Sequence, residues 1–231
     1  MTYKDRIHSI LRGYFWGIVI ALVIVLFASW VASIYVDGVE GLLTARGIRW
    51  MCSSIVSNFA AVHLAEMLLG LMAISVLRES GIIRTIRGHV SLKQKRALQI
   101  TGVAVLLVLG LFSLLLLLPK AVLLSAFGTF RHSAFSKGFY GLLMCLLIFV
   151  GNVYGYTVGR FLSLRDFVHA HVAIFSSVAS YFVILLFASQ LVGCIEFTGI
   201  LPLLGDDGTA LFWLRGILYN VPLLLYILLA L

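Results

Sequence analysis

The chain has 231 residues, of which 62% are hydrophobic and 11% are charged. Soluble domains carry about 45–50% apolar and about 25% charged residues, so this composition excludes an ordinary water-soluble domain and predicts an integral membrane protein. The formal charge of +8 is carried by short segments between apolar runs, a pattern typical of topology control. We therefore expect the lipid bilayer to surround the chain, and we expect no nucleic-acid partner.

Six apolar runs are long enough to cross a bilayer as helices. About 20 apolar residues span the hydrocarbon core, and a helix satisfies its own backbone hydrogen bonds there. The first run is too long for the core of a signal peptide, so we expect it to be retained as an anchor. The predicted fold is all-α, a single polytopic membrane domain over residues 1–231 with spans near 14–36, 50–77, 98–118, 138–159, 172–193 and 211–231.

Lysine and arginine residues fall mainly on one side of these spans. If the N-terminus is inside, the inner segments hold eleven basic residues and the outer segments hold five. The densest connector is RTIRGHVSLKQKR, at residues 84–96. Because cytoplasmic loops carry the excess of basic residues, we expect both the N- and the C-terminus to be cytoplasmic.

Two ionisable residues, His63 and Glu66, lie near the middle of the second predicted span. Residues three apart share one face of a helix, and an isolated charge in lipid is costly. One interpretation is a proton relay that faces an interior cavity. The other is a structural clip, in which the two side chains share a hydrogen bond that lowers the cost of burying them.

Three glycines in GNVYGYTVG, Gly151, Gly155 and Gly159, are spaced four apart. This small-xxx-small pattern lets two helices approach closely. We interpret it as a helix-packing ridge.

No pattern in the sequence predicts an enzyme, a cofactor or a metal site. The three cysteines, Cys52, Cys145 and Cys194, are scattered without C-x-x-C spacing. His169 and His171 are two residues apart and would not share a helix face. A Glu-x-x-His metal motif would need the opposite order from His63 and Glu66, together with a second pair.

Several short pieces occur in an order that resembles a known family. They are EGLLTARGIRWMCSSIVSNF and LRESGIIRTIR, followed by SLKQKRAL, SAFSKGF, VYGYTVG, SLRDF and YFVILLFASQLVGCIEFTGIL. Across most of residues 39–204 this order resembles the AbgT-type p-aminobenzoyl-glutamate transporter family. The resemblance implies a secondary transporter of the bacterial cytoplasmic (inner) membrane that moves a small organic anion such as aminobenzoyl-glutamate, with coupling to protons and a homodimeric assembly.

Two amide side chains match positions of the family. Asn58, beside Phe59, matches its Asn-Phe pair, and Gln190 matches its Ala-Ala-Gln helix. The resemblance implies that these amides contact a ligand. The alternative is an interhelical hydrogen bond, worth about 1 kcal/mol or less in a membrane. With His63 and Glu66, they are the candidates for a substrate or proton pathway.

The chain also departs from the family pattern. The family follows Asn-Phe with a Pro-Leu-Gly break, whereas this chain has AAVHLAEM, whose residues favour an unbroken helix. The Ser-Asp-Ala-Gly and Gly-Gly-Phe-Ser-Ala-Asn patterns do not occur here. The alternative function is therefore a non-transporting degenerate scaffold, or an accessory membrane protein that binds a partner.

Overall fold

The computed structural model describes residues 3–88, 90–117, 134–203, 205 and 208–230. These residues form helices and no strand, which confirms the all-α prediction. The six predicted spans are confirmed as well, although residues 118 and 231, predicted as span ends, lie outside the described residues. The candidate spans are Asp5–Tyr35, Ala45–Ser80, Leu92–Leu114, Gly138–Val158, Leu164–Thr198 and Thr209–Leu229.

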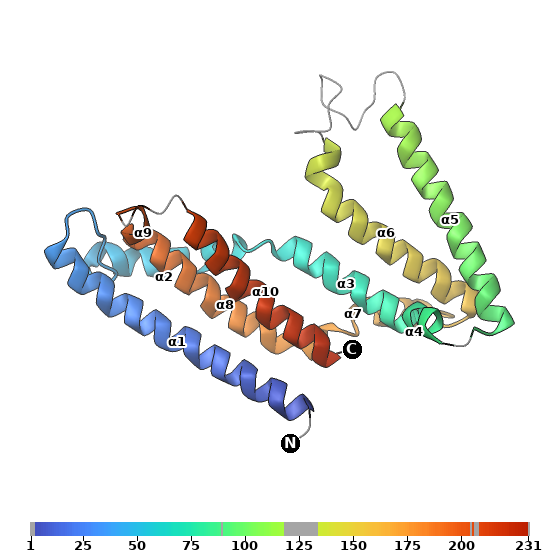
Figure 1. Cartoon of the computed structure of the whole chain (residues 1–231), viewed down its shortest axis with the longest axis horizontal. Helices are drawn as coiled ribbons and strands as arrows, with labels where there is room; N and C mark the ends of the chain where they lie inside the picture. Colours follow the sequence, from blue (N-terminus) through green and yellow to red (C-terminus); the bar gives the residue numbers. More distant parts are fainter. Residues whose placement is uncertain (1–2, 89, 118–133, 204, 206–207, 231) are drawn as a thin grey trace. The chain divides into compact units, whose positions relative to one another are not determined.

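The chain forms two compact units, Met1–Leu64 with Ser177–Leu231 (unit 1) and Ala65–Ser176 (unit 2). The single domain predicted over residues 1–231 stays a prediction, since each unit is compact on its own. The helices of unit 1 in Figure 1 are α1 (Tyr3–Tyr35), α2 (Ala45–Ala60), α8 (Phe175–Thr198), α9 (Ile200–Leu203) and α10 (Thr209–Ala230). Those of unit 2 are α3 (Leu64–Ser80), α4 (Ile82–Arg87), α5 (Leu92–Leu117), α6 (Ala134–Val158) and α7 (Leu164–Val172).

Helix α8 is the centre of unit 1. It is apolar around its whole circumference, as expected of a membrane span, and it contributes many buried residues, Val178, Tyr181, Leu185, Ala188 and Val192 among them. The rings of Phe15 in α1 and Phe187 in α8 meet edge to face, with their centroids 5.3 Å apart. Trp50 in α2 stacks on Phe197 at 4.4 Å. These aromatic contacts attach α1 and α2 to α8.

Helix α10 contains Pro222, which is buried. A proline inside a helix removes the bond to the carbonyl four residues earlier, here that of Leu218. Two tyrosine hydroxyls donate to the carbonyls on either side of Leu218. Tyr14 Oη in α1 lies 3.1 Å from the oxygen of Ile217, and Tyr181 Oη in α8 lies 3.1 Å from that of Tyr219. Neither of these carbonyls is the one that Pro222 leaves without a helical donor, so the two bonds act as ties that hold α1 and α8 to α10.

Unit 2 is organised around α6. The hydroxyls of Thr85 in α4 and Tyr154 in α6 lie 2.7 Å apart, and Tyr154 is buried with Ile82 and Ala97. Helix α7 begins with a capping box, in which the Ser163 hydroxyl accepts from the amide of Asp166 and the Asp166 carboxylate accepts from the amide of Ser163. These two hydrogen bonds satisfy backbone amides that have no partner within the first turn of α7.

Two of the candidate spans, Ala45–Ser80 and Leu164–Thr198, are interrupted. The second stops at Ala60 and restarts at Leu64, and the fifth stops at Val172 and restarts at Phe175. The expectation of an unbroken helix through AAVHLAEM was therefore wrong. The amide of Val62 bonds the carbonyl of Phe59, one residue short of the α-helical partner, and the Val62 side chain is buried. Helix propensity is weak and tertiary packing overrides it here.

Candidate functional site

An amide pair joins α2 to α8 in unit 1. Asn58 Nδ2 donates to Gln190 Oε1 at 3.1 Å, and Gln190 Nε2 donates to the carbonyl oxygen of Ile55 at 3.0 Å. Both side chains are half-buried. The structure therefore brings together two of the four residues predicted for a substrate or proton pathway, although 132 positions separate them in the sequence.

A glycine makes room for this pair. Gly193 lies three residues after Gln190, on the same face of α8. A Cβ atom added at Gly193 would lie 2.5 Å from Asn58 Nδ2, much closer than any ordinary contact. The absence of a side chain there lets the Asn58 amide reach α8. Chemically, such a pair can hold two helices together, or it can exchange one of its hydrogen bonds for a bond to a ligand.

His63 and Glu66 lie on either side of a helix start. His63 is exposed in the segment between α2 and α3, and Glu66 is exposed in the first turn of α3. His63 and Glu66 do not share one helix as predicted, because His63 precedes the first residue of α3. A carboxylate in the first turn is favoured by the helix dipole, which accounts for Glu66 locally. Their role in a proton pathway stays a prediction.

The three glycines of the predicted ridge face different neighbours in unit 2. A Cβ at Gly151 would lie 2.7 Å from Cγ1 of Val76 in α3, and one at Gly155 would lie 2.3 Å from the ring of Phe161. Gly159 follows the last residue of α6 with φ +82, the left-handed conformation with which many helices end.

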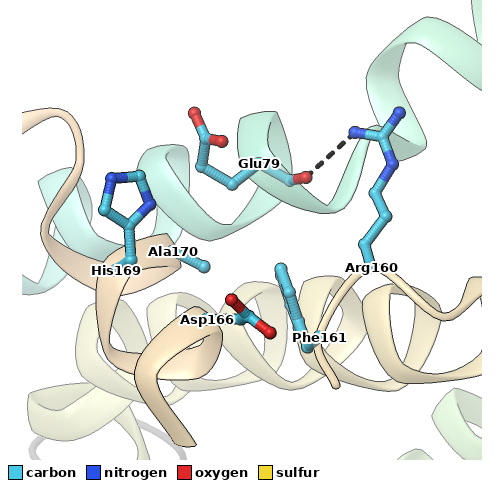
Figure 2. Close-up of a pocket in the computed structure, with 6 residues that line it drawn as sticks. All are labelled: Glu79, Arg160, Phe161, Asp166, His169 and Ala170. Carbon is cyan, nitrogen blue, oxygen red and sulfur yellow. Dashed lines mark hydrogen bonds between the residues drawn. The ribbon is translucent and has the colours of Figure 1, made fainter. Parts of the chain in front are cut away.

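Unit 2 contains a pocket that the sequence analysis did not anticipate. Its volume is about 260 Å³. Figure 2 shows the side chains that line it, which are Glu79, Arg160, Phe161, Asp166, His169 and Ala170. Phe161 and Ala170 are buried with Val76 in an apolar cluster. The other four lining residues are polar: two carboxylates, one guanidinium group and one imidazole.

Helix ends hold the charged groups of this pocket in place. Arg160 Nη1 donates to the carbonyl oxygen of Glu79 at 3.0 Å, which satisfies a carbonyl at the C-terminus of α3. Asp166 Oδ2 accepts from the amides of Leu162 and Ser163 at 3.2 and 3.0 Å. The signals in the sequence were the Ser-x-x-Asp capping pattern and the glycine that follows α3. Neither pattern indicated that the two helix ends would meet.

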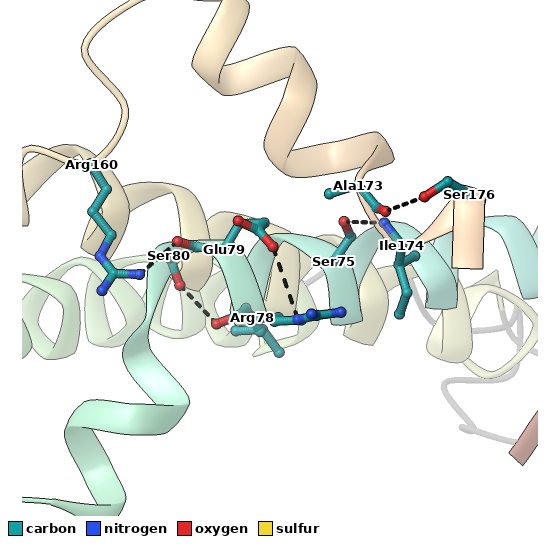
Figure 3. Close-up of polar contacts among 9 residues, drawn as sticks. Ser75, Arg78, Glu79, Ser80, Arg160, Ala173, Ile174 and Ser176 are labelled. Atoms are coloured by element: carbon teal, nitrogen blue, oxygen red, sulfur yellow. Dashed lines mark hydrogen bonds and ion pairs between the residues drawn. The ribbon is translucent and has the colours of Figure 1, made fainter. Parts of the chain in front are cut away.

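The second interrupted span is fixed by a hydroxyl from α3. Ser75 Oγ accepts from the amide of Ile174 at 3.2 Å, and Figure 3 shows this bond beside that of Arg160 to Glu79. Helices α7 and α8 are separated at this point, so the amide needs a partner other than the carbonyl of a continuous helix.

Buried His171 forms a second polar contact near this interruption. Its Nδ1 lies 2.7 Å from the carbonyl oxygen of Phe167 and therefore carries the proton. Its Nε2 then accepts from Asn152 Nδ2 at 3.4 Å. Asn152 Oδ1 is buried without a hydrogen-bond partner among the described residues. The two histidines of HAHV thus lie in different surroundings, since His169 is exposed at the pocket.

A family model, the AbgT putative transporter family, matches residues 83–231, which is more than half of the chain. The match includes Gln190 and the interruption between α7 and α8. Asn58, His63 and Glu66 precede it, so their place in the family pattern rests on the sequence resemblance alone. No curated protein and no solved structure matches the chain.

Proposed function

The chain belongs to the AbgT putative transporter family, and on this basis we propose that it moves a small organic anion of the aminobenzoyl-glutamate type across the bacterial cytoplasmic membrane. The proposal includes coupling to protons, cytoplasmic N- and C-termini and a homodimer. It does not include an enzymatic step, a cofactor or a metal ion.

The observation that supports the proposal is the pair of interrupted spans, at residues 61–63 and 173–174. In secondary transporters, discontinuous helices place backbone groups and helix ends where substrates and coupling ions bind. An uninterrupted helix would occupy its backbone groups with its own hydrogen bonds.

Polar side chains lie next to the first interruption. Asn58 precedes it by three residues, His63 lies within it, and Glu66 follows in the first turn of α3. We assign His63 and Glu66 to the proton pathway, since ionisable residues in a span are rare unless they are functional. We assign Asn58 and Gln190 to the substrate, whose carboxylates and amide suit an amide donor.

The test is uptake of radiolabelled p-aminobenzoyl-glutamate into proteoliposomes, with and without a pH gradient. We expect uptake that the gradient accelerates, and we expect Glu66→Gln to remove the acceleration. Glu196→Gln is the matched control, because Glu196 is exposed and pairs with Arg215 at 2.7 Å. A gradient effect that survives Glu66→Gln would refute the proton role.

A second function is favoured by the hydrogen bonds of the amide pair. Asn58 and Gln190 bond to each other and to the backbone of α2, as expected of a clip in a non-transporting scaffold or an accessory protein that binds a partner. A reconstituted, folded protein without any uptake, whose stability falls on Asn58→Ala, would favour this function over transport.

A further inference from the structure

Helix α4 carries exposed basic side chains at the surface of unit 2. Its inner face is fixed by Ile82, which is buried, and by Thr85, whose hydroxyl lies 2.7 Å from that of Tyr154. Arg84, Ile86 and Arg87 are exposed. The helix therefore directs two guanidinium groups and one isoleucine outward.

The start of α5 and the end of α6 lie beside α4. A Cβ at Gly159, just after α6, would be 3.5 Å from Lys93 Nζ in the first turn of α5. The next residue, Arg160, reaches the start of α4, where a Cβ at Gly81 would lie 2.5 Å from its Cζ atom. The cations of three segments are thus gathered at one end of unit 2.

We call this end the basic surface. Segments 81–98 and 159–165 contain no Asp or Glu, and the acidic residues that flank them, Glu79 and Asp166, lie with Arg160 at the pocket. Exposed apolar side chains lie among the cations, with Ile86 69%, Leu92 80%, Leu162 83% and Leu164 77% exposed. The cations of the basic surface, all exposed, are Arg84, Arg87, Lys93, Lys95, Arg96, Arg160 and Arg165.

The depth of the basic surface follows from the spans that end there. The candidate span of α5 begins at Leu92, and that of α6 ends at Val158. The surface therefore lies where two helices leave the hydrocarbon, at the level of the lipid headgroups. Exposed leucines at this depth enter the acyl boundary, while lysine and arginine reach outward to phosphate.

We propose that the basic surface binds the headgroups of anionic phospholipids in the leaflet that contains it. The charge is complementary, and the exposed leucines suit a lipid better than a soluble polyanion. Clusters of four to eight basic residues next to a span are typical of such binding. The proposal is independent of transport, so it can fail while the uptake assay succeeds, and the reverse.

The experiment counts bound lipids by native mass spectrometry of the full chain in detergent, titrated with dioleoyl phosphatidylglycerol or dioleoyl phosphatidylcholine. We expect tighter binding of phosphatidylglycerol. Each basic side chain near an anionic surface contributes about a factor of five, so Arg84→Gln/Arg87→Gln should weaken that binding about 25-fold. Lys93→Gln/Lys95→Gln is a second variant with the same expected loss, should the first fail to fold.

The control is Arg46→Gln/Arg49→Gln, which removes two exposed cations from α2 in unit 1. It should retain the preference for phosphatidylglycerol. Equal binding of the two lipids, unchanged binding in both basic-surface variants, or an equal loss in the control would overturn the proposal. So would full competition by soluble glycerol phosphate, because the site would then recognise phosphate without needing a lipid.

Discussion

The close approach of Gly193 to Asn58 predicts that two substitutions will compensate each other. In Gly193→Ala the new methyl group would lie 2.5 Å from Asn58 Nδ2, so the Asn58 side chain must move and its bond to Gln190 breaks. Interhelical hydrogen bonds in membranes average about 0.6 kcal/mol, and overpacking costs about 1–3 kcal/mol. We expect Gly193→Ala to lower the free energy of unfolding by about 2–3 kcal/mol.

The second substitution, Asn58→Ala, removes the side chain with which the new methyl group would collide. Asn58→Ala alone loses the hydrogen bond and should cost about 1 kcal/mol. In Asn58→Ala/Gly193→Ala the added methyl group occupies the space that the amide left. The double variant should therefore be about as stable as Asn58→Ala, with a coupling of about 2 kcal/mol between the two sites.

Reversible unfolding in mixed micelles, followed by circular dichroism, measures all four proteins of this cycle. Val192→Ala is the control for a small change at the neighbouring buried residue, and its cost should add to that of Asn58→Ala. If Gly193→Ala and Asn58→Ala were also additive, the contact between Gly193 and Asn58 would not exist in the folded protein.

Two further predictions use the same unfolding assay. Tyr181→Phe removes the donor to the carbonyl of Tyr219 and should cost about 1 kcal/mol. Tyr14→Phe removes the donor to the carbonyl of Ile217 and should cost less, because that bond is exposed. Unchanged stability in Tyr181→Phe would count against the bond between α8 and α10. Ser75→Ala leaves the amide of Ile174 without its hydroxyl partner and should cost about 1–3 kcal/mol. Ser189→Ala, the control, removes a buried hydroxyl that donates to the carbonyl of Leu186 in its own helix, and it should cost less. Equal costs of the two substitutions would argue against the bond from Ile174 to Ser75.

The sequence was sufficient to predict the helical class and the six spans. Composition and apolar length determine which segments enter lipid, and both can be read from the chain directly. The interruption at residues 61–63 was not predictable in this way, because no proline or glycine marks it. It depends on the burial of Val62 and on a backbone bond to Phe59, which are products of tertiary packing.

The candidate site was predictable only as separate residues. Asn58 and Gln190 were each identified by resemblance to a family position, but nothing in the sequence joined them. The signal in retrospect is Gly193, since a glycine three residues after a polar residue on an apolar helix marks a close approach. The pocket around Arg160 had even less signal, because its side chains come from helix ends that meet only after α3, α6 and α7 have packed.

The strength of the amide pair bears on both candidate functions. A clip that maintains a scaffold should be strong and permanent, but a hydrogen bond between two neutral amides in a membrane contributes only about 0.6 kcal/mol on average. At that strength, thermal energy breaks the bond often, and a ligand carboxylate competes well, because bonds to a charged acceptor are about twice as strong. Packing around Gly193 can hold α2 on α8 without the bond. The pair is thus better suited to exchange its partner than to hold the helices, and an added substrate that weakens the coupling between Asn58 and Gln190 in a double-mutant cycle would show that exchange directly.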